Sequence, residues 1–361
     1  MGILRTILAL AVVIFHSHEL SGIGMTKGRV SVQAFYIISG FYMALILNEK
    51  YTGKGSYKLF ITNRLLRIYP VYWVVLVAAL LVSLVGYYGF GSPYYLSRYI
   101  SYSGCLHPFS IACFVMENII IVGQDILFFL GIGSDCHLFF TKFPLSESQT
   151  AFNYMLVPQA WSVSLELMFY AIAPFLVRRH WTWQILLVMA SLGLRFWMMH
   201  AFYLTMDPWT YRFFPLELAF FMAGSLAYRY YKTLEKKVVS NYVGYGLLAV
   251  CALCVIFFDE PYPGYDSKKW VFYGLELVSL PFIFKVFKEN RFDRWIGELS
   301  FSLYISHHLI VMVLRQFFYA HPDYMAYYGY AAVAVSLLVA LVLNRLVVEP
   351  LNRKREKRIL G

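Results

Sequence analysis

Charged residues are scarce in this chain of 361 residues, because Asp, Glu, Lys and Arg together make up only 14% of it. An ordinary soluble domain contains about 25% charged residues, so the composition excludes a water-soluble globular protein. Hydrophobic residues make up 60% of the sequence, and the mean hydropathy is +0.59. In a soluble protein the net charge of +11 would suggest a nucleic-acid partner. In a chain this apolar we expect no nucleic acid.

Apolar runs of about 20 residues recur along the whole chain, and each can cross the roughly 30 Å hydrocarbon core of a bilayer as a helix. The sequence therefore predicts an all-α polytopic membrane protein embedded in the lipid bilayer. We expect residues 1–349 to form a single membrane domain and residues 350–361 a basic cytoplasmic tail. The ten candidate spans are 3–21, 30–48, 68–88, 157–176, 183–204, 213–231, 241–258, 270–287, 297–319 and 325–348.

The distribution of Lys and Arg predicts the orientation. With both termini in the cytoplasm, the inner loops carry most of these residues, as the positive-inside rule requires. An eleventh apolar stretch, 113–131, contains Glu117 and Asp125, which are costly in lipid. If that stretch were a span, every later loop would change sides and the basic tail would face outward. We therefore predict a re-entrant or surface helix inside a long outer loop, residues 89–156.

Cysteine is rare, with five residues in the chain, and three of them fall in the predicted outer loop: Cys105, Cys113 and Cys136. An odd number of cysteines cannot all pair. One disulfide could form among the three if the loop faces an oxidising compartment, but its connectivity cannot be read from the sequence. Unpaired cysteines that pack as small hydrophobic residues are the simpler interpretation.

Ionisable residues inside a span are informative, because each is costly at mid-bilayer unless it is satisfied or functional. Arg5 and His16 in the first span are about three helical turns apart, so they share one face with a rise of roughly 16 Å between them. Arg5 is then expected near the cytoplasmic edge and His16 near or beyond the middle of the bilayer. A snorkelling arginine and a histidine bonded to a neighbour would explain the pair equally well.

Arg64 and Arg67 are predicted where the third span begins, with Pro70 in its first turn. Residues at i and i+3 share a helix face, and the start of a helix offers free N–H groups. Two guanidinium groups in this place suit a phosphate-bearing ligand. The alternative is ordinary positive-inside anchoring, which also predicts arginine on this side.

Glu166 in the fourth span is expected at about the depth of His16, where a carboxylate and an imidazole could act as an orienting group and a base. A structural glutamate neutralised by an arginine such as Arg195 is the alternative. In the ninth span Tyr304 and His307 share a face, although a core histidine bonded to a serine is an equally good explanation. We expect no metal site, because no histidine spacing in the chain is diagnostic of zinc.

Six short motifs follow one another across nearly the whole chain. They are Leu4-Arg5 with His16, Phe35-Tyr-Ile-Ile-Ser39-Gly40-Phe41, Arg64-Leu-Leu-Arg67-Ile-Tyr-Pro70, Trp161-Ser-Val-Ser-Leu-Glu166, Ser302-Leu-Tyr304-Ile-Ser-His307 and Glu349-Pro350. Each motif is weak alone, but six in order are specific. Together they resemble the membrane-bound acyltransferase family 3, whose members O-acylate surface glycans and some small molecules.

The resemblance implies an acyl-CoA donor that binds from the cytoplasm, an acceptor hydroxyl on the far side and no tightly bound cofactor. It implies that His16 is catalytic and that Arg64 and Arg67 serve the phosphates of CoA. We expect Glu166 to orient His16, and Arg5 to stabilise the donor at its inner end. Supporting positions within the motifs are Ser39, Trp161, Ser162, Tyr304 and His307.

Residues 1–349 are thus expected to be an acyltransferase-like domain of a multi-pass inner-membrane protein. Acetyl-CoA is the expected donor, and the expected acceptor is a hydroxyl of a cell-surface polysaccharide or a lipid-linked sugar. Some relatives carry a fused hydrolase-like domain outside the membrane. Only a short basic tail follows the last span here, so we expect direct transfer or a separate partner protein. A proton-coupled secondary transporter or a flippase-type protein of glycan assembly is the alternative, because the same buried charges could form a relay.

Overall fold

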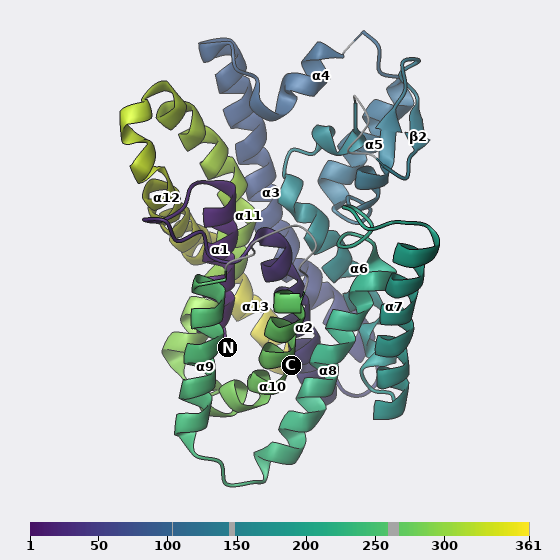
Figure 1. Ribbon diagram of the computed structural model, residues 1–361, viewed down its shortest axis with the longest axis vertical. Helices are drawn as coiled ribbons and strands as arrows, with labels where there is room; N and C mark the ends of the chain where they lie inside the picture. Colours follow the sequence, from purple (N-terminus) through teal and green to yellow (C-terminus); the bar gives the residue numbers. More distant parts are fainter. Residues whose placement is uncertain (103, 144–148, 259–266, 361) are drawn as a thin grey trace.

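The protein is a bundle of helices, as its computed structural model shows (Figure 1). The structure describes residues 1–102, 104–143, 149–258 and 267–360. In chain order, its α-helices are α1 (Gly2–His16), α2 (Gly28–Glu49), α3 (Ser56–Phe90), α4 (Ser97–Ser101), α5 (Pro108–Ile120), α6 (Trp161–Leu176), α7 (Trp181–Ala201), α8 (Phe214–Glu235), α9 (Asn241–Ile256), α10 (Ser267–Phe287), α11 (Arg291–Ala320), α12 (Tyr328–Leu343) and α13 (Glu349–Leu360). A π-helical segment, Asn344–Val348, joins α12 to α13.

Every predicted span coincides in large part with a helix of the structure. Within the described residues, six helical stretches are long and apolar enough to cross a membrane. These are Gly28–Glu49, Ser56–Phe90, Trp181–Ala201, Lys268–Phe287, Arg291–Ala320 and Pro322–Arg358. The shorter apolar helices are α1, α5 and α9. The chain is therefore an all-α multi-pass membrane protein, and the number of ten spans stays a prediction.

Two predicted boundaries are wrong in ways that affect the site. α1 ends at His16, not at residue 21, because the polar residues that follow favour an exposed turn. α3 begins at Ser56, well before the predicted start at residue 68, so Pro70 lies in the helix interior. Arg64 is consequently two turns inside α3, away from the free N–H groups of its first turn.

The start of α1 is fixed by a side chain of α11. The carboxylate of Asp293 accepts hydrogen bonds from the backbone N–H groups of Gly2, at 2.8 Å, and Ile3, at 2.9 Å. A carboxylate at a helix N-terminus satisfies free donors and opposes the positive end of the helix dipole. This contact sets the position of α1 along α11 and so places Arg5, one turn further on.

α2 and α8 approach each other closely because glycine stands at their contact. A Cβ atom on Gly40 of α2 would overlap the backbone carbonyl of Phe221. A Cβ atom on Gly224 of α8 would likewise overlap the carbonyl of Ile37. Small residues allow membrane helices to pack backbone against backbone. The same contact fixes the position of Ser39, the residue before Gly40.

The long loop between α3 and α6 contains α4, α5 and a hairpin of two short strands, β1 (Leu130–Ile132) and β2 (Leu138–Phe140). The hairpin was not predicted, because its first strand lies in an apolar stretch that the sequence analysis assigned to a helix. α5 has 13 residues, about 20 Å of helix. That length is short of a hydrocarbon core of roughly 30 Å, but α1 and α9 are also shorter than this core, so the non-spanning position of this segment stays a prediction.

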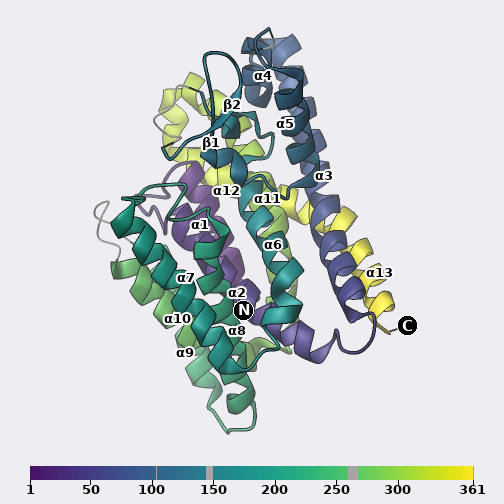
Figure 2. The same ribbon diagram turned by 90° about the vertical axis from the view of Figure 1, so that its right-hand side faces the viewer.

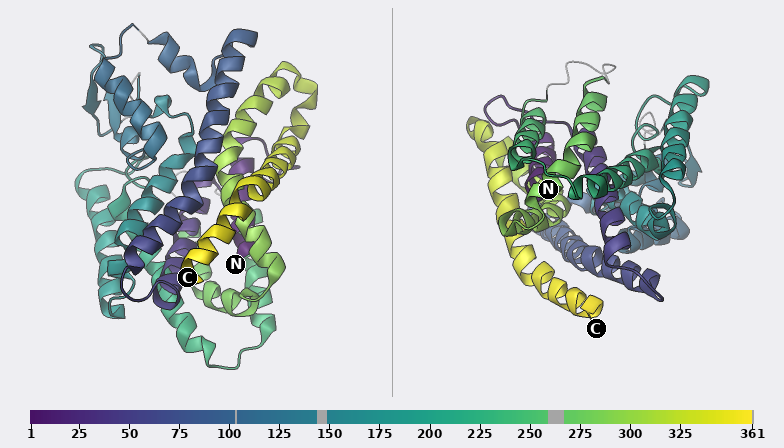
Figure 3. Two further views of the ribbon diagram at one scale, coloured as in Figure 1. Left: turned by 180° about the vertical axis from the view of Figure 1, so that it is seen from behind. Right: turned by 90° about the horizontal axis from the view of Figure 1, so that it is seen from below.

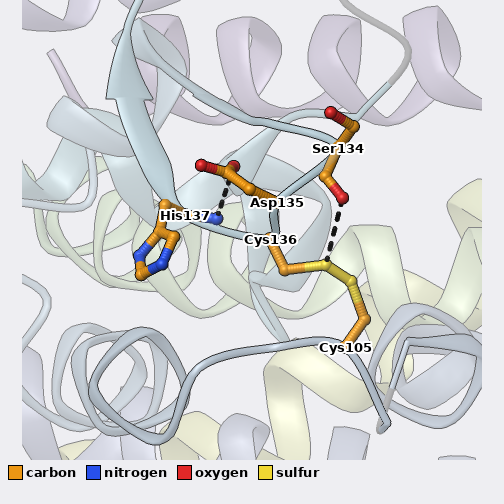
Figure 4. Close-up of a disulfide and its surroundings, with 5 residues drawn as sticks. All are labelled: Cys105, Ser134, Asp135, Cys136 and His137. Carbon is orange, nitrogen blue, oxygen red and sulfur yellow. Dashed lines mark hydrogen bonds between the residues drawn. A yellow bond between two sulfur atoms is a disulfide. The ribbon is translucent and has the colours of Figure 1, made fainter.

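A disulfide joins Cys105 to Cys136 in this loop, with the two Cα atoms 5.7 Å apart (Figure 4). It connects the segment before α5 to the turn of the β1–β2 hairpin. Cys113 of α5 is a free cysteine in the described structure. The structure thus settles a pairing that the sequence left open, and the simpler interpretation of three unpaired cysteines is wrong.

Both chain ends lie in the half of the molecule opposite the long loop (Figures 1 and 3). α13, drawn in yellow, runs beside the N-terminal part of α3, and the two helices are in contact (Figures 2 and 3). The sequence analysis treated residues 350–361 as a tail outside the domain. In the structure this segment is a helix packed on the bundle. Which side of the membrane this half faces stays a prediction.

Candidate functional site

A cavity of about 670 Å³ is lined by residues of α1, α2, α3, α6, α8, α10, α11 and α13. Its volume is in the range of small-molecule and cofactor sites. The cavity brings together seven of the ten predicted site residues: Arg5, Ser39, Arg64, Arg67, Ser162, Glu166 and Tyr304. The other three, His16, Trp161 and His307, lie outside its lining. The cavity lining also includes basic residues of the predicted cytoplasmic side, among them Lys50, Lys288 and Arg355.

Arg64 is buried in the wall of this cavity, with 5% of its surface exposed. Its Cζ atom lies 5.8 Å from the ring centroid of Phe60 and 5.9 Å from that of Tyr170. Nε of Arg64 has no hydrogen-bond partner among the described residues, and neither Arg64 nor Arg67 forms an ion pair with them. Positive-inside anchoring predicts side chains that reach out to water. Burial toward a cavity favours the binding of an anion instead.

Arg5 lines the same cavity, and its Cζ atom lies 6.0 Å from the ring centroid of Tyr42 on α2. The side chain therefore points into the bundle. The alternative interpretation of Arg5, a side chain that snorkels to the membrane surface, is therefore wrong. Because Arg5 and Arg64 come from α1 and α3, one helix on each side of the cavity contributes a guanidinium group.

Glu166 is held by hydroxyl groups and not by His16. Ser39 Oγ donates to Glu166 Oε1 at 2.7 Å, and the hydroxyl of Tyr170 donates to the same oxygen. In the described residues no hydrogen bond joins Glu166 to His16, so the predicted orienting pair is not formed. His16 lies at the outer end of α1, whereas Glu166 faces the cavity.

The alternative interpretation, in which Arg195 neutralises Glu166, is also wrong. Arg195 Nη2 donates to Glu217 Oε1 at 2.7 Å, in an ion pair buried between α7 and α8. Gln33 Nε2 of α2 donates to the same carboxylate at 2.9 Å. The carboxylate of Glu217 is thus both paired with a charge and hydrogen-bonded in the bundle interior, as a buried charge requires. The three side chains therefore hold α2, α7 and α8 together.

Ser162 and Tyr304 close the end of the cavity opposite the predicted cytoplasmic side. Their hydroxyl oxygens are 2.6 Å apart, and Tyr304 OH also donates to the backbone carbonyl of Gln159 at 3.2 Å. One hydroxyl comes from α6 and the other from α11. The histidines His307 and His308 lie about one turn further along α11.

His16 and His307 lie together, with ring centroids 5.1 Å apart. His307 is fully buried, and its Nδ1 donates to the backbone carbonyl of Tyr304 at 2.5 Å. No serine holds it, contrary to the alternative interpretation. Nδ1 of His16 donates in the same way to the carbonyl of Val12 at 2.9 Å. Since a carbonyl only accepts, Nε2 of each neutral ring carries the lone pair and can take up a proton.

A third histidine, His308, has its ring centroid 5.7 Å from that of His16 and is 2.6 Å from the hydroxyl of Tyr95 through Nδ1. His16 itself is exposed at the end of α1. Nε2 of His307 has no hydrogen-bond partner within the described chain. In that part of the chain, no group of three or more histidine, cysteine or acidic side chains is arranged to hold a metal ion.

The indole ring of Trp161 packs against the guanidinium group of Arg212. The Cζ atom of Arg212 lies 4.2 Å from the ring centroid of Trp161 and 3.8 Å from that of Phe128, and its Nε is 2.8 Å from Asp207 Oδ1. Aromatic faces attract a cation in this way. Trp161 is thus one residue from Ser162 but lies outside the cavity lining.

Sequence reasoning missed two contributors to the cavity, Tyr170 and Arg355. Tyr170 stands four residues after Glu166, a spacing that places two side chains on one helix face and could have indicated the hydrogen bond. Arg355 lies among other basic residues of the C-terminal segment, so no sequence signal separates it from its neighbours.

Comparison with known proteins matches residues 1–345 to a family described as an acyltransferase domain. Three relatives from Staphylococcus aureus, of strains COL, MSSA476 and N315, are named as proposed O-acetyltransferases. Each is 22% identical over 385 aligned positions, which cover 97% of this chain and 56% of the relative. The chain thus spans about half the length of the curated relatives it matches. No solved structure matches it.

Proposed function

The chain belongs to the acyltransferase 3 family, as the six ordered motifs predict, and from this premise we propose that it transfers an acyl group from acyl-CoA to a hydroxyl group. The names of its relatives favour acetyl as that group. The acceptor is a cell-surface polysaccharide or a lipid-linked sugar, and the protein lies in the inner membrane with the cavity open to the cytoplasm. One observation carries the proposal: a single cavity joins Arg64 and Arg67, which form no ion pair among the described residues, to Ser162 and Tyr304.

The donor enters this cavity with its phosphates on Arg64 and Arg67. Guanidinium groups bind phosphate through paired, charge-assisted hydrogen bonds, and a buried guanidinium with a free N–H gains most from such a ligand. The pantetheine arm of the donor then extends toward Ser162 and Tyr304. Glu166 lies along this path, where its carboxylate can accept hydrogen bonds from the amide N–H groups of the arm. Arg5, on the opposite wall, adds positive charge at the inner end.

His16 supplies the base in this proposal. Its free Nε2 takes the proton of the acceptor hydroxyl as the hydroxyl oxygen attacks the thioester carbonyl carbon. The C–S bond then breaks, CoA leaves as a thiolate, and the proton held on His16 passes to the sulfur. General base catalysis of this kind contributes about 100- to 10,000-fold in rate. His307, beside His16, can share the transferred proton through its own Nε2.

The hydrogen-bonded pair Ser162–Tyr304 stands between the donor cavity and the histidines. The thioester therefore reaches His16 only when the two hydroxyls separate. Each has a second bond available when they do, because Ser162 Oγ also donates to the carbonyl of Gln159 at 3.1 Å. The transfer step accordingly includes a small rearrangement between α6 and α11.

Thermal unfolding of the purified protein with and without acetyl-CoA tests donor binding. Ligand at 100 times its dissociation constant stabilises a protein by about 2.7 kcal/mol, which is readily seen as a higher unfolding temperature. We expect this shift in the wild type and its loss in the Arg64→Ala, Arg67→Ala double variant. A Lys54→Ala, Lys58→Ala double variant removes the same charge from exposed positions near the start of α3 and should keep the shift.

Acetyl transfer to a surface polysaccharide, followed by mass spectrometry of the product, then tests the reaction. A folded wild type that shows no acetyl-CoA shift would contradict the proposal and favour the proton-coupled transporter. A shift that survives in the Arg64, Arg67 double variant would contradict the assigned phosphate site.

A further inference from the structure

Helix α13 begins with the Glu349-Pro350 motif, but it lies beyond residues 1–345, which the family comparison matches, and it forms part of the cavity wall. The match ends at residue 345, and α13 spans Glu349–Leu360. The helix runs along the N-terminal part of α3, the helix that carries Arg64 and Arg67 (Figures 2 and 3). From α13 the side chains of Asn352 and Arg355 line the cavity.

Arg355 differs from the other basic residues of α13 in its surroundings. Its Nη1 donates to Asn352 Oδ1 at 2.6 Å, and its buried Nε has no hydrogen-bond partner in the described structure. By contrast, the adjacent Arg353 and Lys354 are exposed. Exposed basic residues at a cytoplasmic membrane face are ordinary. An inward-facing arginine with an unsatisfied donor in a cavity wall requires another explanation, because a buried unmet donor is costly.

Four arginines from three helices gather at this end of the cavity. Arg67 is near enough to Arg5, Arg64 and Arg355 for the positive charges to act on one another. Within the described chain none of the four forms an ion pair. Glu298 of α11 also lines the cavity, and its carboxylate attracts Arg67 and Arg355. The arginines repel one another, and a ligand with several negative charges would offset that repulsion.

We propose that Arg355 of α13 completes the phosphate-binding site and contacts a phosphate at the nucleotide end of acyl-CoA. This inference rests on the proposed function. It adds to that function a binding residue from outside the family match, and it makes α13 part of the donor site. Three guanidinium groups, those of Arg64, Arg67 and Arg355, then face a donor that carries a diphosphate and a further phosphate on the ribose.

Isothermal titration of acetyl-CoA into the purified full chain in a neutral detergent tests the assignment. Loss of a charge-assisted contact predicts that Arg355→Ala binds acetyl-CoA about tenfold more weakly or worse. Lys354→Ala removes the same charge from an exposed position one residue away and should stay within about twofold of the wild type. Arg355→Lys, which keeps the charge but not the paired geometry, should fall between them.

A second readout separates ligand binding from a structural role. Without ligand, Arg355→Ala should unfold at the wild-type temperature or above, because the change removes a repelled charge. A residue needed only for packing would lower that temperature. Should Arg355→Ala fail to fold, the Arg355→Lys affinity decides. Titration with acetyl-dephospho-CoA, which lacks the ribose phosphate, identifies the phosphate contacted: the variant's deficit disappears if Arg355 binds that group and persists if it binds the diphosphate.

An anionic lipid headgroup carries the same phosphate chemistry and supplies the competing outcome. Phosphatidylglycerol is therefore titrated into wild type and Arg355→Ala in parallel. Loss of lipid stabilisation with unchanged acetyl-CoA affinity would overturn the inference, as would unchanged affinity for both ligands. If the wild type itself does not bind acetyl-CoA, the proposed function fails, whereas an unaffected Arg355→Ala beside a binding wild type removes only the role of Arg355.

Discussion

The imidazole of His307 lies beside that of His16, with ring centroids 5.1 Å apart, where the outer end of α1 meets α11. Each ring is anchored by Nδ1 on a carbonyl of its own helix, so both present Nε2 as a base. No hydrogen bond joins the two rings in the described structure. This relationship connects the exposed His16 to the buried part of the site.

Replacing His16 by Ala should lower acetyl transfer at least about 100-fold, because it removes the proposed base. His307→Gln should lower transfer less and alter the acid limb of the pH–rate profile, because His16 loses its neighbour. Both variants should keep the acetyl-CoA shift in unfolding temperature, since neither residue lines the donor cavity. His200→Gln, at the exposed end of α7, is the control and should change neither quantity. Wild-type transfer by folded His16→Ala would show that the mechanism is wrong.

Gly40→Ala should destabilise the protein by about 1 to 3 kcal/mol, because the added Cβ atom overlaps the carbonyl of Phe221 and forces α2 away from α8. Gly193→Ala is the matched change in α7, where no described atom lies within 4 Å of an added Cβ. There the better helix propensity of Ala should leave stability unchanged or raise it by up to about 1 kcal/mol. Unfolding temperatures in detergent compare the two. Equal effects would mean that the α2–α8 contact is not close.

The outer loop should become less stable as the pH rises toward neutrality. Burial raises the pKa of Glu117 in α5 to about 7, and the neighbouring carboxylate of Asp125 adds to the rise. Because the folded loop favours the neutral acid, this stabilisation is fully present below the ordinary value of 4.5 and is lost as the pH passes 7. Glu117→Gln should remove this part of the pH dependence. Hydrogen exchange of residues 108–132 between pH 4.5 and 7.5 measures it, and identical slopes in variant and wild type would contradict the account.

The Cys105–Cys136 disulfide closes a loop of 31 residues in sequence separation. A cross-link of this length contributes about 3 to 4 kcal/mol in the chain-entropy description. Cys105→Ser should therefore lower the stability of the outer loop, and a reductant should do the same to the wild type only. Cys113→Ser is the control and should behave as wild type. If a reductant leaves the wild-type unfolding temperature unchanged, the loop does not depend on the bond.

Much of the fold could be predicted because each span leaves its own mark in the sequence. A helix must be long and apolar to cross lipid, so the ten predicted segments all coincide with helices. The ends of the helices were harder to predict. Hydropathy does not mark where α1 stops at His16 or where α3 begins at Ser56, because caps and water-facing turns decide these boundaries.

The cavity residues could be found from the motifs, but their pairing could not. Matched depth in two spans suggested that Glu166 faces His16. The depth of a residue in the membrane does not specify how far apart two helices lie or which way each helix face turns. In the structure Glu166 accepts hydrogen bonds from Ser39 and Tyr170 instead. The inward position of Arg355 was hidden for a similar reason, since basic residues surround it on the same helix.

In the proposed function, the hydrogen-bonded hydroxyl pair Ser162–Tyr304 has a second consequence, which concerns the passage of protons through the protein. On the predicted orientation, the cavity opens toward the cytoplasm, and the exposed His16 faces the opposite side of the membrane. A continuous file of water and histidines between them would conduct protons down the membrane potential. A membrane protein that transfers a group from one side to the other must therefore never form a continuous water path across the membrane. On the proposed function, the short contact between α6 and α11 would therefore let an acyl group cross while the ion gradient is preserved.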